Sequence, residues 1–570
     1  MKKRLVAAIL CLVTLVGVLA GCNNTYVATD TSTRAMTVVI ALVSDEKPSE
    51  DARLEVEKAL STVTKQLYSI EVRLDIYTPD EYRSAITKKL EAREEAFLDF
   101  TNEDTSIADT DSYVKNEYGR DEIRYPDTYP NQVDILLVND PLMLREFAEK
   151  GWLYALEGSD CMTSNDAEGL LISKHIPEAL RNIGVIDESL YAISGNSVYQ
   201  DYQYLLVDKK LYTDWGTTKA EDIKGLDSIN DFLVNLAKNE SDVIPLYNVT
   251  NMGITTATGN KESIVGQFIS DVDQANILSS TFFPNSILAQ PEVKSQIATI
   301  CNLRAAGGEM PKHTYDVDFS KKFGACYVSG TAETVEKYKE DYYVVPVVKP
   351  LATTESIYDS MFGVCTFSSD PVRAFKVFSL LYTNSQFVNT LLYGVENKHY
   401  TVDPVSGILT KMEDCDYNMN RYGVGNVFLT KQCSDMTEKE LSLSANGWKH
   451  GKTALSELLL TPYLGFEFKY NEITDFEETA ENKYLGRDVE DNLEMMYTEL
   501  LLKIADFSDT INPATGVPYT FDEFYTELGN WVKNDEYVKA ALKTGEGASY
   551  SFRSQYEAWY NLMHPKVEEE

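Results

Sequence analysis

Residues 36–77 read MTVVIALVSDEKPSEDARLEVEKALSTVTKQLYSIEVRLDIY, and the fold class follows from the periodicities in this stretch. Residues 36–43 form a continuous apolar, β-branched run, which indicates a buried strand. Residues 51–67 carry apolar side chains at helical spacing. Residues 70–76 alternate between apolar and charged side chains, which predicts a strand with one buried face, near a sheet edge. A helical pattern over 80–98 completes an order typical of a parallel α/β sheet.

The alternation is interrupted once and then resumes. Residues 101–131 hold many Asp, Glu, Thr and Tyr residues and two prolines, which indicates a long surface insertion. Residues 133–138 form a short apolar run followed by a helical pattern that starts at Pro141, a residue suited to a first helical turn. The same patterns predict strands over 202–207, 243–246, 323–328 and 342–348, and helices over 228–238, 331–339, 370–382, 385–393, 492–504 and 521–542.

Composition excludes some classes of partner. The 570 residues include 52 Lys and Arg against 89 Asp and Glu, a formal net charge of −37. Such an acidic surplus argues against nucleic acid as the main partner, which requires a basic face, and against adsorption on anionic lipid through a basic patch. The 36 tyrosines are the second unusual feature, since Tyr presents a flat apolar ring with a polar tip.

The N-terminus predicts export. A basic start at 1–4, an apolar run at 5–18 and the sequence Leu-Ala-Gly-Cys at 19–22 have the layout of a secretory signal peptide, residues 1–21. The run is too short for a membrane span. Leu-Ala-Gly-Cys resembles the bacterial lipobox, which implies lipidation of Cys22, a flexible tether over 22–35 and a location on the outer face of the cell membrane.

Motifs for catalysis, cofactors and metals are missing from the sequence. It contains no P-loop, no GxGxxG after a strand and no HExxH, and its five His residues have no ligand-like spacing. The sequence therefore predicts no catalytic residues, no metal ligands and no cofactors. The six cysteines after Cys22 lack CxxC spacing and suit buried apolar positions, although a disulfide such as Cys415–Cys433 remains open.

Eight segments resemble, in order, those of bacterial extracellular solute-binding proteins of family 1, the sugar-binding lipoproteins of ABC importers. Residues 133–141 and 149–156 resemble the family's "PDI…xGxLxPL" segment, and 392–400 reads LYGVENKHY against "NYGIEGKHY". The other segments are 190–209, 323–330, 342–350, 371–382, 425–429 and 464–466. Two departures are Val207, where the family has Tyr, and Thr331, where a Trp often follows the Gly.

The resemblance implies a two-lobe α/β fold of the periplasmic-binding-protein type II class, with a hinge, a cleft and an extended helical C-terminal part. The expected N-terminal lobe joins 36–195 with 362–410, and the expected C-terminal lobe joins 196–361 with 411–570. The crossings between the lobes are expected near 191–204, 355–365 and 400–425.

Candidate ligand-binding residues are polar or aromatic side chains at strand ends and crossings. Aromatic rings pack on sugar faces, and carboxylates, amides and hydroxyls bond to sugar hydroxyls. The carboxyl ends of parallel strands are where α/β proteins usually bind ligands. The candidates are Ser44, Asp45, Asn139, Asp140, Tyr199, Gln200, Asp201, Tyr202, Tyr247, Tyr358, Phe362, Tyr422 and Asn426.

Several candidates also fit a structural role. Asp140 stands directly before a proline and suits a helix N-cap equally well. Strand alternation turns at least one of the tyrosines in 199–204 toward the core. Tyr358 and Phe362 fit packing at a hinge, and Asn426 fits a turn better than a ligand contact.

The sequence therefore predicts a non-enzymatic, monomeric receptor that is anchored in the membrane through lipid on Cys22. It binds a carbohydrate, preferably an oligosaccharide, and delivers it to ABC transporter permease subunits. Two alternatives from other classes remain open. One is a secreted surface glycoside hydrolase, which needs two cleft carboxylates about 5–10 Å apart. The other is an adhesin that binds glycans without transport.

Overall fold

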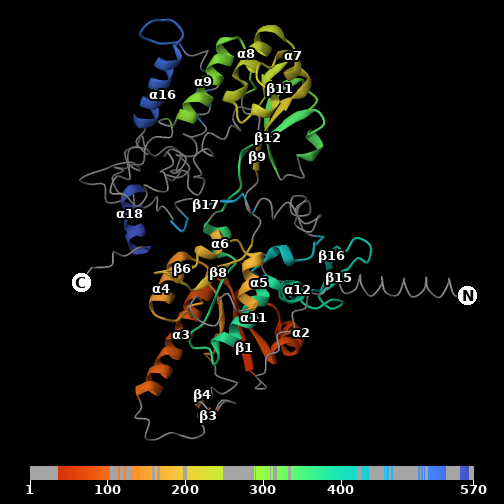
Figure 1. Cartoon of the computed structure of the whole chain (residues 1–570), viewed down its shortest axis with the longest axis vertical. Helices are drawn as coiled ribbons and strands as arrows, with labels where there is room; N and C mark the ends of the chain where they lie inside the picture. Colours follow the sequence, from red (N-terminus) through yellow and green to blue (C-terminus); the bar gives the residue numbers. More distant parts are fainter. Residues whose placement is uncertain are drawn as a thin grey trace, which may run out of the picture.

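The computed structural model describes two groups of elements that follow each other along the long axis of the molecule (Figure 1). The described residues are 36–102, 113–115, 121–123, 131–156, 161–162, 167–196, 202–247, 288, 291–308, 310–311, 317–330, 335–352, 354–417, 419, 425–434, 455, 457–460, 464–466, 499–500, 502–504, 506, 511–534 and 552–563. None of the helices within these ranges is long and apolar enough to cross a membrane.

The first unit contains a five-stranded sheet in the order β2-β1-β5-β14-β8. Its strands are β1 (Met36–Val43), β2 (Ile70–Tyr77), β5 (Ile135–Leu137), β8 (Ala192–Ser194) and β14 (Met361–Val364). β1 is parallel to β2 and β5, whereas β14 is antiparallel to β5 and β8. β2 lies at the edge and its exposure alternates along the strand, as its sequence pattern predicts.

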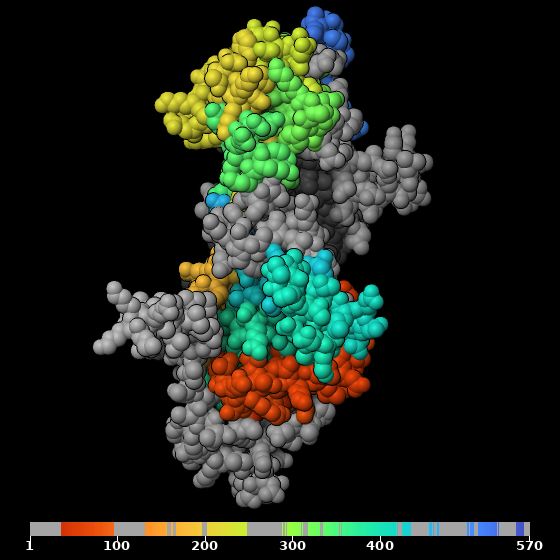
Figure 2. All heavy atoms as spheres, turned by 90° about the vertical axis from the view of Figure 1, so that its right-hand side faces the viewer, coloured from red at the N-terminus to blue at the C-terminus, as the bar shows by residue number. Residues whose placement is uncertain are grey.

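Helices cover this sheet and complete the first core. They are α2 (Glu50–Tyr68), α3 (Pro79–Asn102), α4 (Pro141–Glu149), α5 (Ala167–His175), α6 (Glu178–Asn182), α10 (Thr354–Tyr358), α11 (Pro371–Thr383) and α12 (Ser385–Tyr393). Short ladders flank them: β3 (Tyr113–Lys115) with β4 (Asp121–Ile123), β6 (Val185–Ile186) with β7 (Ser189–Leu190), and β15 (Tyr400–Val402) with β16 (Leu409–Lys411). Figure 2 shows the N-terminal elements in red against residues 354–434 in green and cyan, which are distant in sequence but share the core.

The second unit contains a four-stranded sheet in the order β10-β11-β9-β12. Its strands are β9 (Tyr202–Asp208), β10 (Ile244–Leu246), β11 (Phe323–Gly330) and β12 (Tyr342–Val348). Its helices are α7 (Lys209–Trp215), α8 (Asn230–Asn239), α9 (Pro291–Ala305) and α16 (Phe521–Asn534), with 3₁₀ turns η1 (Ala220–Asp222), η2 (Asp227–Ile229) and η7 (Glu336–Tyr338). β10 is parallel to β11, whereas β9 is antiparallel to both its neighbours. Like the first sheet, the second is therefore mixed rather than purely parallel. The expected α/β class with two lobes is confirmed.

Within the part of the chain that the structure describes, three crossings connect the units, and they are bonded to one another. The first lies between β8 and β9, and the second follows β12. Strand β13 (Leu351–Ala352) of the second crossing pairs with β17 (Leu459–Leu460), which belongs to the third. The hydroxyl of Tyr202, at the first crossing, donates to Glu457 Oε2 at 2.6 Å. The three crossings therefore meet at one place.

The third crossing lies later in the chain than 400–425, where the sequence places it. Residues from the range expected in the second lobe, 411–570, pack in the first core instead; they are Tyr417, Met419, Cys433 and Leu455. A β-bridge between Leu409 and Cys433 holds this segment on the first unit. Phe466 is the next described residue in the second core. Long-range packing therefore keeps the chain on the first unit beyond the expected lobe boundary at 410.

Asp134 is a buried carboxylate that joins distant parts of the first unit. It accepts hydrogen bonds from the Val39 backbone N–H at 2.8 Å, from Gln132 Nε2 at 2.7 Å and from the Ser368 hydroxyl at 2.5 Å. Its burial disfavours the charged form and raises the pKa, although these three bonds oppose the shift.

All six cysteines after Cys22 are free thiols in the structure, so the disulfide Cys415–Cys433 is not formed. Five are buried and Cys415 is part-exposed. Burial raises the pKa of Cys301 and of Cys365 to about 12, which leaves both thiols protonated and inert at neutral pH.

Candidate functional site

The carboxyl ends of β1 and β5 lie next to each other because the two strands are parallel neighbours. Ser44 is buried, and its backbone N–H donates to the Tyr77 carbonyl at 2.9 Å; Asp45 beside it is exposed. Asn139 follows β5 and is half-buried, and its Oδ1 is shielded from solvent without a hydrogen-bond partner. This edge therefore brings together a hydroxyl, a carboxylate and an amide.

The side chain of Asp140 is engaged by contacts with helix α4 and with Arg83. Its carboxylate accepts from the backbone N–H of Met143 at 2.7 Å and caps α4, whose first residue is Pro141. Arg83 pairs with the other carboxylate oxygen at 2.8 Å. These contacts match the structural role that the sequence left open for Asp140.

The first crossing contributes tyrosines to the hinge. Tyr202 is 7% exposed, its ring stacks on Tyr204 with centroids 5.5 Å apart, and burial, reinforced by Glu457, raises its pKa. Both rings pack against Val335. Tyr199, Gln200 and Asp201 lie outside the described residues.

The remaining candidates lie in packed surroundings, except Tyr422, which lies outside the described residues. Tyr247 packs on Phe323, with ring centroids 5.5 Å apart. Tyr358 and Phe362 belong to the first core and are 4% and 0% exposed. In this conformation these rings offer little or no surface to a ligand.

Asn426 is 1% exposed, and its side chain makes three hydrogen bonds. Its Oδ1 accepts from the Phe428 backbone N–H and from Asn196 Nδ2, both at 3.1 Å. Its Nδ2 donates to the Tyr382 carbonyl at 3.0 Å. The residue caps the 3₁₀ turn η9 (Val427–Leu429), in line with the turn that the sequence favours.

A junction around Gly465 joins elements of both units. The Gly465 N–H donates to the Thr354 hydroxyl at 2.8 Å. A Cβ at this position would lie 3.2 Å from Pro141 Cβ and 3.3 Å from Cζ2 of Trp559, and φ is +87°. Only glycine combines this conformation with so close an approach. The start of α4 and the C-terminal helix α18 (Phe552–Met563) therefore meet across one glycine.

Helix α18 contacts both units, and Figure 1 shows it at the height between the two sheets. Tyr556 and Trp559 pack on Phe466, with ring centroids 5.3 and 5.7 Å away. At the end of α18, the Met563 carbonyl accepts from Arg145 of α4 at 2.5 Å. No sequence motif gives Trp559 a role. The spacing of Tyr556 and Trp559 predicts that both lie on one helix face, but it does not reveal which segments that face contacts.

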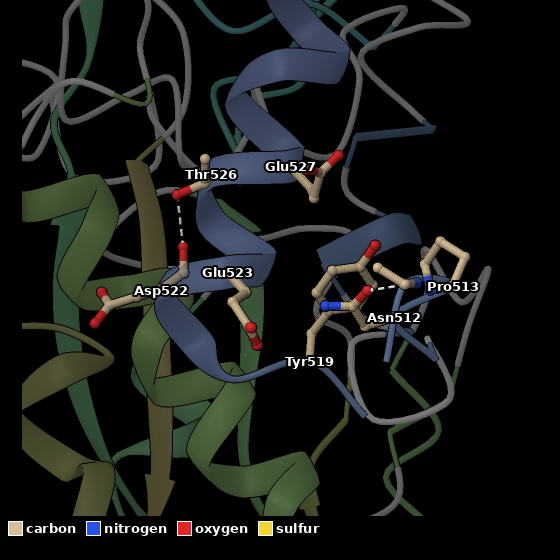
Figure 3. A pocket seen from close by; sticks show the side chains of 8 residues that line it. Asn512, Pro513, Tyr519, Asp522, Glu523, Thr526 and Glu527 are labelled. Carbon is tan, nitrogen blue, oxygen red and sulfur yellow. Dashed lines mark hydrogen bonds between the residues drawn. The ribbon is translucent and has the colours of Figure 1, made fainter. Parts of the chain in front are cut away.

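A pocket of about 500 Å³ lies beside the first turns of α16 in the second unit (Figure 3). Its lining residues are Asn512, Pro513, Ala514, Tyr519, Asp522, Glu523, Thr526 and Glu527. Glu523 accepts from the N–H and hydroxyl of Thr520 at 2.9 and 2.8 Å, and Asp522 lies 3.6 Å from Lys294. These two carboxylates therefore serve the helix cap and an ion pair.

Comparisons with known proteins gave matches of structure only. No family model and no curated protein matches the chain. Among solved structures, the N-glycan transport solute binding protein of Streptococcus pneumoniae is 13% identical with a TM-score of 0.39, over 92% of this chain and 98% of that one.

Two further structures have similar values. A family 1 extracellular solute-binding protein from Alicyclobacillus acidocaldarius is 12% identical with a TM-score of 0.41, over 88% of this chain and 100% of that one. An ABC-transporter-associated solute binding protein from Bifidobacterium longum infantis that binds HMO is 13% identical with a TM-score of 0.37, over 93% and 100%. At such values the assignment of function rests on the chain's own residues.

Proposed function

We propose that the protein is a solute-binding receptor of an ABC importer that binds a carbohydrate, preferably an oligosaccharide, between its two units. The observation that carries the proposal is the meeting of three bonded crossings between two α/β units. Such a connection permits rotation of one unit against the other about a few residues.

The residues at the edge of the first sheet suit such a ligand. Ser44, Asp45 and Asn139 offer a hydroxyl, a carboxylate and an amide, which are the groups that bond to sugar hydroxyls. A ligand that contacts both units favours the closed form, and that form is the one a permease would recognise. Lipid on Cys22 holds the receptor at the outer face of the membrane in this proposal.

Calorimetry tests the ligand class. The chain from residue 23 onward is titrated with neutral oligosaccharides, their monosaccharides and short peptides. We expect heat of binding with at least one oligosaccharide and a smaller radius of gyration by solution scattering when that ligand is bound. Binding of peptides without any glycan contradicts the carbohydrate proposal.

The same samples separate the two alternatives. Release of shorter sugars from the bound glycan, detected by chromatography, supports a glycoside hydrolase instead. Glycan binding with an unchanged radius of gyration supports an adhesin without closure.

The anchor is tested in cells. Cys22→Ser is expected to abolish incorporation of labelled palmitate and to shift the protein from the membrane fraction to the medium. Retention of the label by this variant contradicts lipidation at Cys22.

A further inference from the structure

The junction around Gly465 contains two polar atoms that are buried and unpaired. They are Oδ1 of Asn139, two residues before Pro141, and Nε1 of Trp559. Gly465 separates Pro141 from the Trp559 ring. One atom therefore belongs to the first unit, two residues along the chain from Pro141, and the other to the Trp559 ring of helix α18.

Other tryptophans show what a satisfied indole does in this protein. Trp152 Nε1 donates to Glu94 at 3.0 Å, and Trp215 Nε1 donates to Glu240 at 3.2 Å. A buried donor or acceptor without a partner is destabilising, so native proteins pair nearly all of them. The N–H of Trp559 and the amide carbonyl of Asn139 are therefore available to a group from outside the chain.

We propose that Trp559 and Asn139 are ligand contacts of the site between the units. The indole N–H donates to the ligand, and the amide Oδ1 accepts from it. The aromatic cluster of Phe466, Tyr556 and Trp559 supplies apolar faces beside these groups. This inference rests on the proposed function and names residues and a ligand class for it.

The two orphan atoms select the chemistry of the ligand. A sugar hydroxyl both accepts and donates, so neighbouring hydroxyls satisfy an N–H donor and a carbonyl acceptor together. A carboxylate only accepts, and an ammonium only donates. The pair therefore fits a sugar through its hydroxyls, whereas a carboxylate or an ammonium group by itself would satisfy only one of the two atoms. Since both atoms are shielded in this conformation, the ligand reaches them when the two units shift relative to each other.

The decisive variant is Trp559→Phe, which keeps an aromatic ring and removes the N–H. The control is Trp531→Phe on α16, where the Trp531 ring packs in the second unit under Lys503 Nζ at 4.8 Å. Calorimetry uses the glycan that the unaltered protein binds. We expect about 5- to 30-fold weaker binding for Trp559→Phe and for Asn139→Ala, and unchanged binding for Trp531→Phe.

Tryptophan fluorescence supplies a readout that a purely structural role leaves unchanged. Glycan binding should alter the emission of the unaltered protein and of Trp531→Phe, but not that of Trp559→Phe. Equal glycan affinity in all variants, with the emission change retained in Trp559→Phe, overturns the inference and leaves the proposed function standing. Absence of glycan binding by the unaltered protein overturns both.

Discussion

Substitution of Asn426 distinguishes a structural role from a ligand contact most clearly, because its sequence position is compatible with both. Asn426→Ala removes three hydrogen bonds and leaves the Tyr382 carbonyl, the Phe428 N–H and Asn196 Nδ2 without this partner. Each such loss in a buried position costs about 1–1.5 kcal/mol. We therefore expect the free energy of unfolding to fall by about 3–5 kcal/mol.

Urea denaturation followed by circular dichroism measures this change. The control is Asn239→Ala at the exposed end of α8, where the lost bond to the Asn235 carbonyl is solvent-accessible; we expect a change of about 0.5 kcal/mol or less there. Glycan affinity of folded Asn426→Ala should equal that of the unaltered protein. A variant with nearly unchanged stability but lost affinity would refute this reasoning and make Asn426 a ligand contact.

The remaining predictions concern pH, the hinge and the thiols. Burial raises the pKa of Asp134 in the folded protein. The contribution of Asp134 to stability is therefore fully present below its unfolded pKa and is lost as pH rises through the raised value. In urea unfolding between pH 4 and 7, the stability of the unaltered protein relative to Asp134→Asn should fall as pH rises. Burial lowers the pKa of His399 in the folded protein, so the contribution of His399 to stability is present above its unfolded pKa and is lost as pH falls through the lowered value. His399→Asn should therefore flatten the decline of Tm below about pH 6.5. Parallel profiles of Tm against pH in the variant and the unaltered protein contradict this. Tyr202→Phe removes the bond to Glu457 and should lower the unfolding free energy by about 1 kcal/mol in denaturant titration, whereas an unchanged value means that the bond does not support the hinge. A thiol reagent at pH 8 should label Cys415 before the five buried cysteines, as mass spectrometry of native protein can show; faster labelling of a buried thiol argues against the packing.

The elements of both sheets were predictable from local patterns. The buried run at 36–43 and the alternation at 70–76 became β1 and the edge strand β2, because side-chain period reports directly which faces of a strand are buried. Residues 202–207 and 342–348 likewise became β9 and β12. The mixed direction of the strands was not predictable, since pairing depends on connections between distant segments.

The arrangement of the candidate site residues was predictable only in part. The edge formed by Ser44, Asp45 and Asn139 follows from strand ends in a parallel pair, which the sequence indicates. Asp140 and Asn426 have the right side chains for a ligand but are engaged by backbone groups and by Arg83 and Asn196. A sequence shows which side chains can bond, and not which of them already have partners.

The sequence by itself determined the α/β class, the positions of most strands and helices, and the acidic character of the chain, because periodicity and composition are local properties. Only the tertiary structure decided where the third crossing lies and that α18 meets α4 at Gly465. It also decided that Asn139 and Trp559 keep unpaired polar atoms. The physical reason is that burial and hydrogen-bond pairing depend on neighbours that lie hundreds of residues apart in the chain, as Arg145 and Met563 do.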